Sequence, residues 1–149
     1  MRNLFFKFFG VLLVCLLITS MKQNGEARRV QNAIMGDIII AKCDCGFSQQ
    51  LSVGGGRLNY QTYCGFPYYC KNCQTLFNNN YLAEEHFCGN CNSADVLPYD
   101  NDSLRAHIRD EAVFGWNLDG KTIYLTDDNY LCPQCRNFTL KFSSVGNWD

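Results

Sequence analysis

The sequence predicts a small β-rich domain of short antiparallel strands with one short helix, preceded by an N-terminal apolar segment. Ten of the 149 residues are cysteine, and most of these stand in close pairs. Short alternating apolar runs and turn residues lie between the pairs, and one long apolar run lies near the N-terminus. An apolar content of 47% excludes a disordered polar chain, and the single long apolar run excludes a multi-span membrane protein.

The N-terminal segment has the pattern of a targeting sequence. Arg2 and Lys7 precede the apolar run 8–18, whose length suits a signal-peptide core of about 7–15 residues better than a membrane span of about 20. Small residues at Gly25 and Ala27 would permit cleavage after Ala27. Cys15, inside the run, is interpreted as an apolar helix residue.

Two alternatives stay open for this segment. Residues 5–21 would form a short membrane anchor if they are retained. Met35 lies shortly before the strand-like run 38–40 and is a second candidate for the first residue of the protein. In that case residues 1–34 would come from a coding region assigned too far upstream. On every interpretation residues 1–35 are a signal or anchor segment with its linker, or a mis-assigned start, and residues 36–149 form the domain.

The domain is acidic. Residues 36–149 hold 8 basic and 13 acidic side chains, a net charge of −5 with both histidines neutral. Non-specific nucleic-acid binders draw their affinity from Lys and Arg, so this balance disfavours them. A nucleic-acid site would need a patch assembled in three dimensions from Lys42, Lys71, Arg105, Arg109, Arg136 and Lys141.

Eight cysteines of the domain form four close pairs. Cys43 and Cys45 have the spacing C-x-C; the spacing is C-x2-C in the pairs Cys70 and Cys73, Cys88 and Cys91, and Cys132 and Cys135. A tight turn with this spacing presents two sulfurs to one side, and two such turns bind one tetrahedral Zn²⁺ at about 2.3 Å. The pairs therefore predict a domain stabilised by two structural zinc ions, each in a closed four-sulfur site, with iron as the alternative ion.

Disulfide and redox chemistry explain these cysteines less well. A small exported domain is often disulfide-bonded, but four separate close pairs would give strained bridges within pairs or crowded bridges between them. A redox dithiol is one C-x2-C pair ahead of a helix in a βαβ unit, which this β-rich sequence does not resemble.

The spacing also predicts which pairs share an ion. Fourteen residues separate Cys73 from Cys88, the separation expected when two turns share one site, so Cys70, Cys73, Cys88 and Cys91 form the predicted inner site. By elimination, Cys43, Cys45, Cys132 and Cys135 form the outer site. Sequential sharing, with the first two pairs on one ion and the last two on the other, is the alternative.

The segments between and around the pairs predict the strands. Residues 38–42 and 138–142 are predicted to be strands of one small sheet, and the ion of the outer site would hold the ends of these two strands together. Residues 74–87 read as strand, turn at 78–80, strand. Glycines 54–56 read as a flexible turn between strands near 51–53 and 58–60.

The segment between the inner site and the last pair reads as an insertion. Asp102 or Ser103 would cap a short helix through Ala112. Residues 114–118 and 121–125 form a predicted hairpin, because Asp119-Gly120 suits a type I′ turn.

With these motifs the sequence resembles the zinc-ribbon superfamily, rubredoxin-like in its turns. The resemblance rests on the C-x2-C-x14-C-x2-C pattern of the inner site and on Cys132-Pro133-Gln134-Cys135 before an alternating strand. The Cys43-Asp44-Cys45-Gly46 start is similar to that of small, uncharacterised bacterial zinc-ribbon proteins. The resemblance implies a double zinc ribbon over residues 36–143 and little about function. Arg136 departs from the pattern, because a glycine, which tolerates positive φ, often follows such a pair.

Enzyme motifs are weak in this chain. His86 and His107 belong to no recognisable catalytic order, and His86 is interpreted as a surface residue. The acid pairs 84–85 and 127–128 are interpreted as solvated turns. Cys64, the one unpaired cysteine of the domain, is interpreted as a small buried residue, with a reactive thiol as the alternative.

Aromatic side chains between the first two cysteine pairs point to contact with another molecule. The cluster Tyr60, Tyr63, Phe66, Tyr68 and Tyr69 exceeds what a small core obviously needs. Half of it could be core, and the remainder would suit an interface, where the acidic charge favours a protein over single-stranded bases. The predicted function is a structural zinc module acting through protein contacts; the alternatives are a nucleic-acid-associated ribbon and an enzyme or redox protein. Because thiolates persist in a reducing compartment, the domain is expected on the cytosolic side, with export through a cleaved leader as the alternative.

Overall fold

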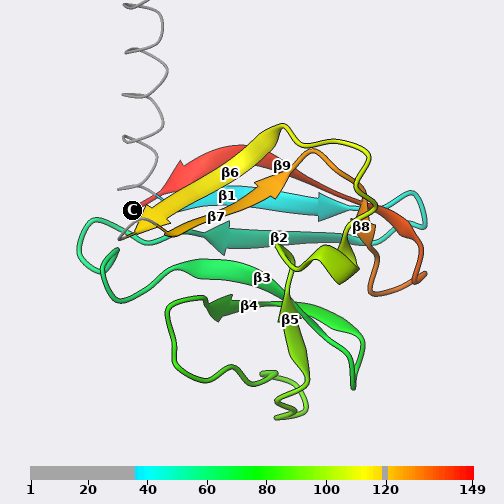
Figure 1. The fold of residues 1–149 in the computed structure, drawn as a ribbon, viewed down its shortest axis with the longest axis horizontal. Helices are drawn as coiled ribbons and strands as arrows, with labels where there is room; N and C mark the ends of the chain where they lie inside the picture. The colour runs from blue at the N-terminus through cyan, green and yellow to red at the C-terminus, as the bar shows by residue number, and fades with distance from the viewer. Residues whose placement is uncertain (1–35, 119–120) are drawn as a thin grey trace, which may run out of the picture. The chain divides into compact units, whose positions relative to one another are not determined.

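A computed structural model of the chain describes residues 36–118 and 121–149 (Figure 1). The predicted signal or anchor segment, Cys15 and the alternative start at Met35 lie outside the described residues, and so does the Asp119-Gly120 turn. Within the described residues no helix is long and apolar enough to cross a membrane.

The two ends of the domain pair in a four-stranded antiparallel sheet with the order β2-β1-β9-β8. Its strands are β1 (Gly36–Lys42), β2 (Ser48–Val53), β8 (Tyr130–Leu131) and β9 (Phe138–Trp148). Strand β1 lies between β2 and β9, with Ala41 opposite Phe142 and Lys42 opposite Lys141. The predicted pairing of the terminal strands is confirmed.

A second, three-stranded sheet has the order β4-β3-β5. Its strands are β3 (Gly65–Cys70), β4 (Thr75–Asn80) and β5 (Val96–Pro98). The predicted strand, turn, strand over residues 74–87 is wrong, because residues 78–80 continue β4 and its partner is β3, before the cysteine turn. The asparagines end the strand through side-chain bonds: Asn80 Oδ1 accepts the N–H groups of Cys64 and Leu82.

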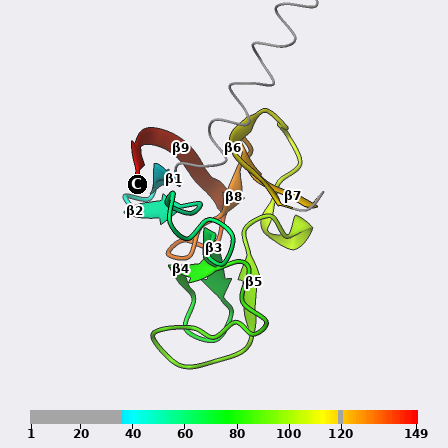
Figure 2. The ribbon, with the colours of Figure 1, turned by 90° about the vertical axis from the view of Figure 1, so that its left-hand side faces the viewer.

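The predicted hairpin is confirmed as β6 (Ala112–Leu118) and β7 (Lys121–Thr126), which pair antiparallel with Leu118 opposite Lys121. Figure 2 shows this hairpin and the two other sheets as separate groups of strands. Trp116 and Leu125 are almost completely buried, so the hairpin covers part of the core.

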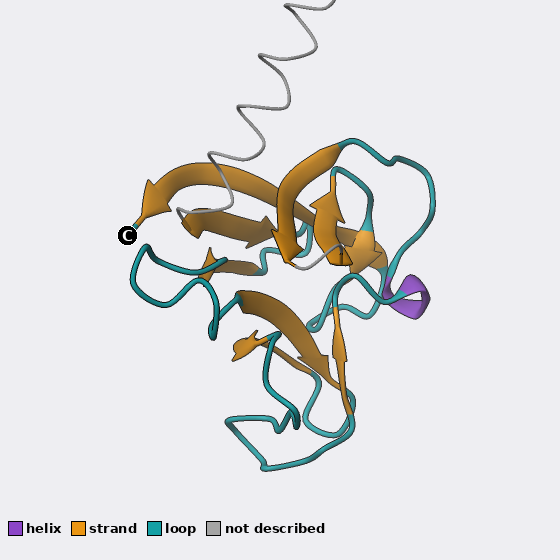
Figure 3. Ribbon diagram, turned by 60° about the vertical axis from the view of Figure 1, so that its left-hand side comes forward, coloured by secondary structure: helices purple, strands orange, loops and turns teal. Residues whose placement is uncertain are grey.

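The predicted helix through Ala112 is wrong. The described residues contain one short 3₁₀ turn, η1 (Asp102–Leu104), which is the helix drawn in Figure 3. Asn101 rather than Asp102 or Ser103 caps it. The buried carboxylate of Asp128 accepts the N–H groups of His107 and Ile108 at 2.7 and 3.0 Å. A helix would use these same donors internally, so this long-range partner replaces it.

Asp128 also contradicts the predicted solvated turn. The Asp128 side chain has no exposed surface, and its Oδ2 lies 3.6 Å from Nε of Arg105. The Arg105 side chain is itself only 10% exposed. Burial opposes ionisation of the carboxyl, but N–H groups led by those of Ile108 and Asn129 lower the pKa of Asp128. The adjacent Asp127 and the pair Glu84 and Glu85 are more exposed.

Three of the five aromatic residues in the cluster are core, close to the half that the sequence analysis assigns to the core. Phe66, Tyr68 and Tyr69 are at most 7% exposed; only Tyr60 and Tyr63 are half-buried. All six side chains of β3 are buried because the strand is central in its sheet and is covered on both faces. The core continues into Tyr99, Tyr130 and Phe142, whose rings meet edge to face at 5.1–6.0 Å.

Glycines 54–56 are buried and do not form the predicted flexible turn. Gly54, at φ 81°, forms a β-bridge to Gly65 and so connects β2 to β3. A side chain at Gly55 would meet the carbonyl oxygen of Tyr63 at 2.4 Å. The strand expected near 58–60 is instead a turn in which Leu58 is fully exposed.

Candidate metal centres

The four cysteine turns meet in two groups. One group holds Cys70, Cys73, Cys88 and Cys91 (the inner site), and the other holds Cys43, Cys45, Cys132 and Cys135 (the outer site). In each group all sulfurs lie within 4.8 Å of one another, so each can hold a metal ion. These are the two groups that the spacing predicts, and sequential sharing is wrong.

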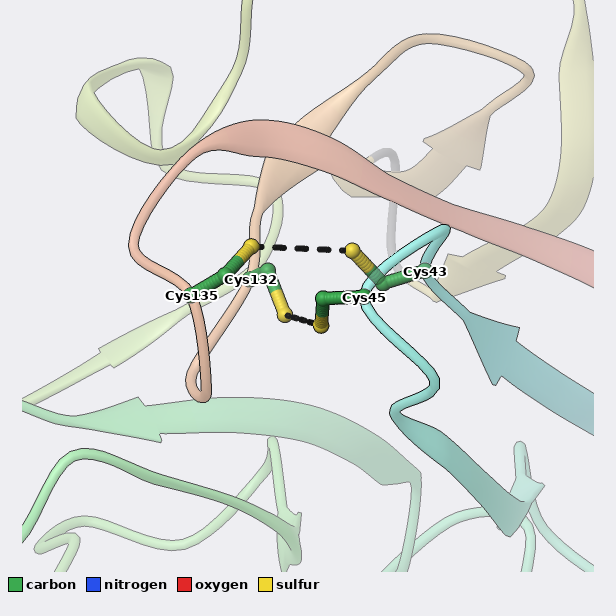
Figure 4. Close-up of side chains that lie close together, drawn as sticks. All are labelled: Cys43, Cys45, Cys132 and Cys135. Carbon is green, nitrogen blue, oxygen red and sulfur yellow. Dashed lines mark hydrogen bonds between the residues drawn. The ribbon is translucent and has the colours of Figure 1, made fainter.

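The sulfur separations fit a tetrahedral ion. In the outer site Cys43 Sγ lies 3.7 Å from Cys135 Sγ, and Cys45 Sγ lies 3.7 Å from Cys132 Sγ (Figure 4). The corresponding separations in the inner site are 3.6 and 3.5 Å. Two sulfurs bound tetrahedrally at about 2.3 Å lie about 3.8 Å apart, whereas a disulfide is about 2.05 Å long.

One backbone conformation recurs after all four pairs. The residue that follows each second cysteine has positive φ: Gly46 at 94°, Gln74 at 54°, Asn92 at 55° and Arg136 at 60°. Arg136 therefore adopts the conformation that a glycine usually provides, and the departure noted in the sequence leaves the turn intact. The αL residue lets the chain reverse direction while both sulfurs stay on one side.

The turns also repeat their hydrogen bonds. Asn92 N–H donates to Cys88 O at 2.8 Å and Arg136 N–H donates to Cys132 O at 2.9 Å. The N–H of the first cysteine donates in turn to the residue after that one, from Cys88 to Ser93 O and from Cys132 to Asn137 O. The C-x2-C turns at 88–91 and 132–135 are thus the same structure built from different residues.

Backbone N–H groups and polar side chains stabilise ionised sulfur in both sites. The N–H of Asn137, together with the Thr139 hydroxyl, lowers the pKa of Cys135 to about 6. Burial opposes ionisation of Cys88, but the N–H groups of Asn90 and Cys91 lower its pKa to about 6. Burial raises the pKa of Cys70 and Cys132 to about 12. Each group therefore offers a ready thiolate to an incoming cation.

Each site has one buried and one open side. The first cysteine of every pair is at most 9% exposed: Cys43, Cys70, Cys88 and Cys132. The second cysteines, Cys45, Cys73, Cys91 and Cys135, are half-buried or exposed. An ion would therefore connect the core to the surface turns, and four sulfurs would leave it no open coordination position.

Two threonines that the sequence reasoning missed contact the sulfurs. Thr139 Oγ1 lies 3.0 Å from Cys43 Sγ and 3.7 Å from Cys135 Sγ in the outer site. Thr75 Oγ1 lies 3.2 Å from Cys73 Sγ and 4.0 Å from Cys88 Sγ in the inner site. Each hydroxyl contacts sulfurs of both turns of its site, and it orients them as groups around metal ligands do. A threonine two or four residues after a cysteine pair is too common to be noticed in the sequence.

Cys64 belongs to neither site. Its side chain has no exposed surface, as the sequence predicts, and burial raises the pKa of its thiol to about 12. His86 is half-buried rather than on the surface: its ring lies against Tyr68 at 4.9 Å, and its Nε2 is 3.2 Å from the tyrosine hydroxyl. Neither residue completes a metal site or an exposed catalytic group.

Half of the predicted basic residues are paired with acids. Lys71 lies 2.9 Å from Asp95, and Arg109 lies 3.4 Å from Asp127. Arg105 contacts Asp110 and Asp128. Lys42 and Lys141 are neighbours across β1 and β9, and Arg136 donates to Gln74 Oε1 at 2.5 Å. Three of the six residues thus have a carboxylate partner.

Comparison of the chain with protein-family models, with curated proteins and with solved structures found no significant match.

Proposed function

We propose that this protein is a double zinc ribbon in which two Zn²⁺ ions are structural and the folded domain acts as a binding or scaffold module through protein contacts. The observation that carries the proposal is the pair of complete four-sulfur groups, with tetrahedral separations and repeated αL turns. Four thiolates saturate zinc, so the ions stabilise the fold and leave no position for a substrate.

The energetic argument supports a structural role. A structural zinc ion contributes about 10–16 kcal/mol of apparent binding free energy, against a total stability of about 5–15 kcal/mol for a typical domain. The two sites join strands that no α-helix supports in the described residues. Removal of both ions should therefore unfold the domain.

The other functions have less support. A nucleic-acid surface would need unpaired basic side chains, whereas Lys71, Arg105 and Arg109 face carboxylates. An enzyme based on Cys64 would need an accessible thiolate, whereas this thiol is buried and hard to ionise. A protein partner is therefore the proposed ligand. We place the domain in a reducing compartment, on the cytosolic side, because eight close thiols oxidise easily elsewhere.

Chelation of the full-length protein tests the structural role. Near-ultraviolet circular dichroism should lose its aromatic signal when a strong zinc chelator is added, and one equivalent of Zn²⁺ per site should restore it. A fold that survives complete metal removal would contradict the proposal. Visible absorption of the purified protein separates the ions, because a ferric four-sulfur site is coloured and a zinc site is not.

A further inference from the structure

A groove of about 620 Å³ lies between the two cysteine sites. Residues 49–52 of β2 line it on one side and residues 74–78, in and next to β4, line it on the other. The cysteine turns contribute Asn90, Pro133 and Gln134. Its volume is within the range of ligand sites, about 300–1,000 Å³.

The backbone edges of both strands face this groove. β2 and β4 each stand at the end of their sheet, so one side of each carries N–H and C=O groups that no neighbouring strand pairs. If one face of a strand lined the groove, only every second residue would line it, because side chains alternate between the two faces. β2 and β4 each contribute consecutive residues, which indicates that the backbone edge of each strand borders the groove.

One hydrogen bond fixes the direction of the β2 backbone. Asn78 Nδ2 donates to Ser52 O at 2.6 Å, so the Ser52 carbonyl points away from β1 and toward β4. Backbone groups of an antiparallel edge strand repeat their direction at every second residue. The N–H and C=O groups of Gln50 therefore point the same way, into the groove.

The lining carries no charged side chain, although the domain holds 8 basic and 13 acidic residues. Phe47 and Phe77 supply apolar surface. Six lining residues carry side-chain amides, which donate and accept hydrogen bonds: Gln49, Gln50, Gln74, Asn78, Asn90 and Gln134. Such a surface suits a neutral ligand with its own donors and acceptors.

We propose that the groove binds an extended, uncharged peptide segment of a partner protein, which adds as a strand to the edge of β2 while the amides bind its side chains. This inference rests on the proposed function, because it names the kind of protein contact that the metal-stabilised domain makes. Both metal centres shape the groove, since Gln74 and Asn90 belong to inner-site turns and Pro133 and Gln134 to an outer-site turn.

The test uses ¹⁵N-labelled, Zn²⁺-loaded full-length protein. The probe is a degenerate pool of capped peptides of about seven residues, the length that spans β2, drawn from Val, Thr, Ser, Asn and Tyr. One matched pool is N-methylated at alternate residues, and another carries Glu or Lys at alternate residues. The neutral pool should shift amide resonances of residues 47–52 and 74–78. The N-methylated pool should bind about tenfold more weakly or worse, because a lost pair of backbone hydrogen bonds costs about that factor. The charged pool should also bind at least about tenfold more weakly, because the groove offers no charged partner for a desolvated Glu or Lys.

Two variants of one residue and a matched control locate the contact. Gln50→Pro removes the groove-facing N–H without removing a bond to β1, and Gln50→Lys places a charge in the groove. Each should weaken binding about tenfold or more, and each should still bind two metal ions. Ser143→Lys adds the same charge to an exposed position of β9 outside the groove and should bind like the natural protein.

Other outcomes overturn the proposal. Shifts of the same residues with cellohexaose but with no peptide pool would make the groove a saccharide site. Shifts that follow protein dilution would make it an interface between copies. A protein with two bound metals and no shift in any pool would end the groove proposal and leave the structural metal centres standing. A folded, metal-free protein would instead end the proposed function.

Discussion

The inner and outer sites share one local structure but join very different lengths of chain. Sulfurs paired in the inner site are 21 and 15 residues apart, whereas those in the outer site are 92 and 87 apart. Loop-closure entropy grows with the logarithm of length, so an outer-site ion restricts the unfolded chain by about 1 kcal/mol more. The outer site also clips β1 to β9, the central strands of the larger sheet. The same turn therefore links segments that are close in the sequence at the inner site and the two ends of the domain at the outer site.

The largest expected effect comes from a matched pair of cysteine variants. Cys135→Ser removes a half-buried outer ligand, and Cys73→Ser removes a half-buried inner one. Because most of the metal-binding free energy, about 10–16 kcal/mol, goes with the ion, Cys135→Ser should unfold the whole domain. Cys73→Ser should release β3, β4 and β5 and keep β1 paired with β9.

Hydrogen exchange read by mass spectrometry distinguishes the two patterns. Amides of β1 and β9 should exchange freely in Cys135→Ser and stay protected in Cys73→Ser. Cys64→Ala is the control, since this thiol lies outside both sites. Equal protection of β1 in the two ligand variants would refute the claim that the outer site holds the whole domain and the inner site holds only β3, β4 and β5.

The segment between the inner site and the last cysteine pair also depends on a buried carboxylate, that of Asp128. Asp128→Asn keeps the size of the side chain but removes the charge that faces Arg105 and several N–H groups. Loss of one partner from a buried ion pair costs about 3 kcal/mol, which urea unfolding at neutral pH should show. Asp127→Asn, at the more exposed neighbour, should cost under 1 kcal/mol. An equal cost for both would mean that Asp128 does not hold this segment.

The pH dependence of that difference has a defined sign. The pKa of Asp128 is lower in the folded state, so its contribution is complete above the unfolded value near 3.9 and is lost as the pH falls through the folded pKa. With Zn²⁺ in excess, the free-energy gap between the natural protein and Asp128→Asn should be constant from about pH 7 to pH 5 and shrink only in stronger acid. A gap that grows as the pH falls would contradict the assigned shift.

The threonine hydroxyls should tune both sites alike. Thr139→Val and Thr75→Val keep the side-chain shape and remove the contacts to two sulfurs each. Loss of such a partner typically weakens metal binding about 10–100-fold, measurable by competition with a zinc indicator. Serine at either position should restore most of the affinity. An effect at one site only would show that the two centres differ in more than the length of chain that each one joins.

The smallest effects should come from the αL residues. Asn92→Gly relieves a positive φ of 55° and should stabilise the domain by a few tenths of a kcal/mol up to about 1 kcal/mol. Arg136→Gly relieves a similar strain but also removes the bond to Gln74, worth about 1 kcal/mol, so its net effect should be near zero. Thermal unfolding of the two variants side by side checks this. A clear gain from Arg136→Gly would show that the link between the two turns carries no stability.

The cysteine groups were predictable because their geometry is local. Two cysteines separated by two residues share a turn whatever the rest of the chain does, and the 14-residue gap limits which turns meet. The outer site followed because only two pairs remained and both adjoined strands. The threonines were not predictable, because their contacts depend on how β4 and β9 leave the turns.

The errors share a cause, since each involves a tertiary partner that the local pattern does not show. The helix expected through Ala112 is lost to Asp128, about twenty residues later. The glycines 54–56 read as a loose turn, but the Gly54–Gly65 bridge buries them. Which members of the aromatic cluster belong to the core was not predictable, because nothing local shows that β3 is the central strand of its sheet.

Native mass spectrometry of the full chain, with a thiol count after denaturation in chelator, tests most directly whether two metal ions hold the domain together. Two divalent metal ions per chain, with every cysteine of residues 36–149 free once the ions are removed, is the expected result. Four disulfides and no metal would contradict it.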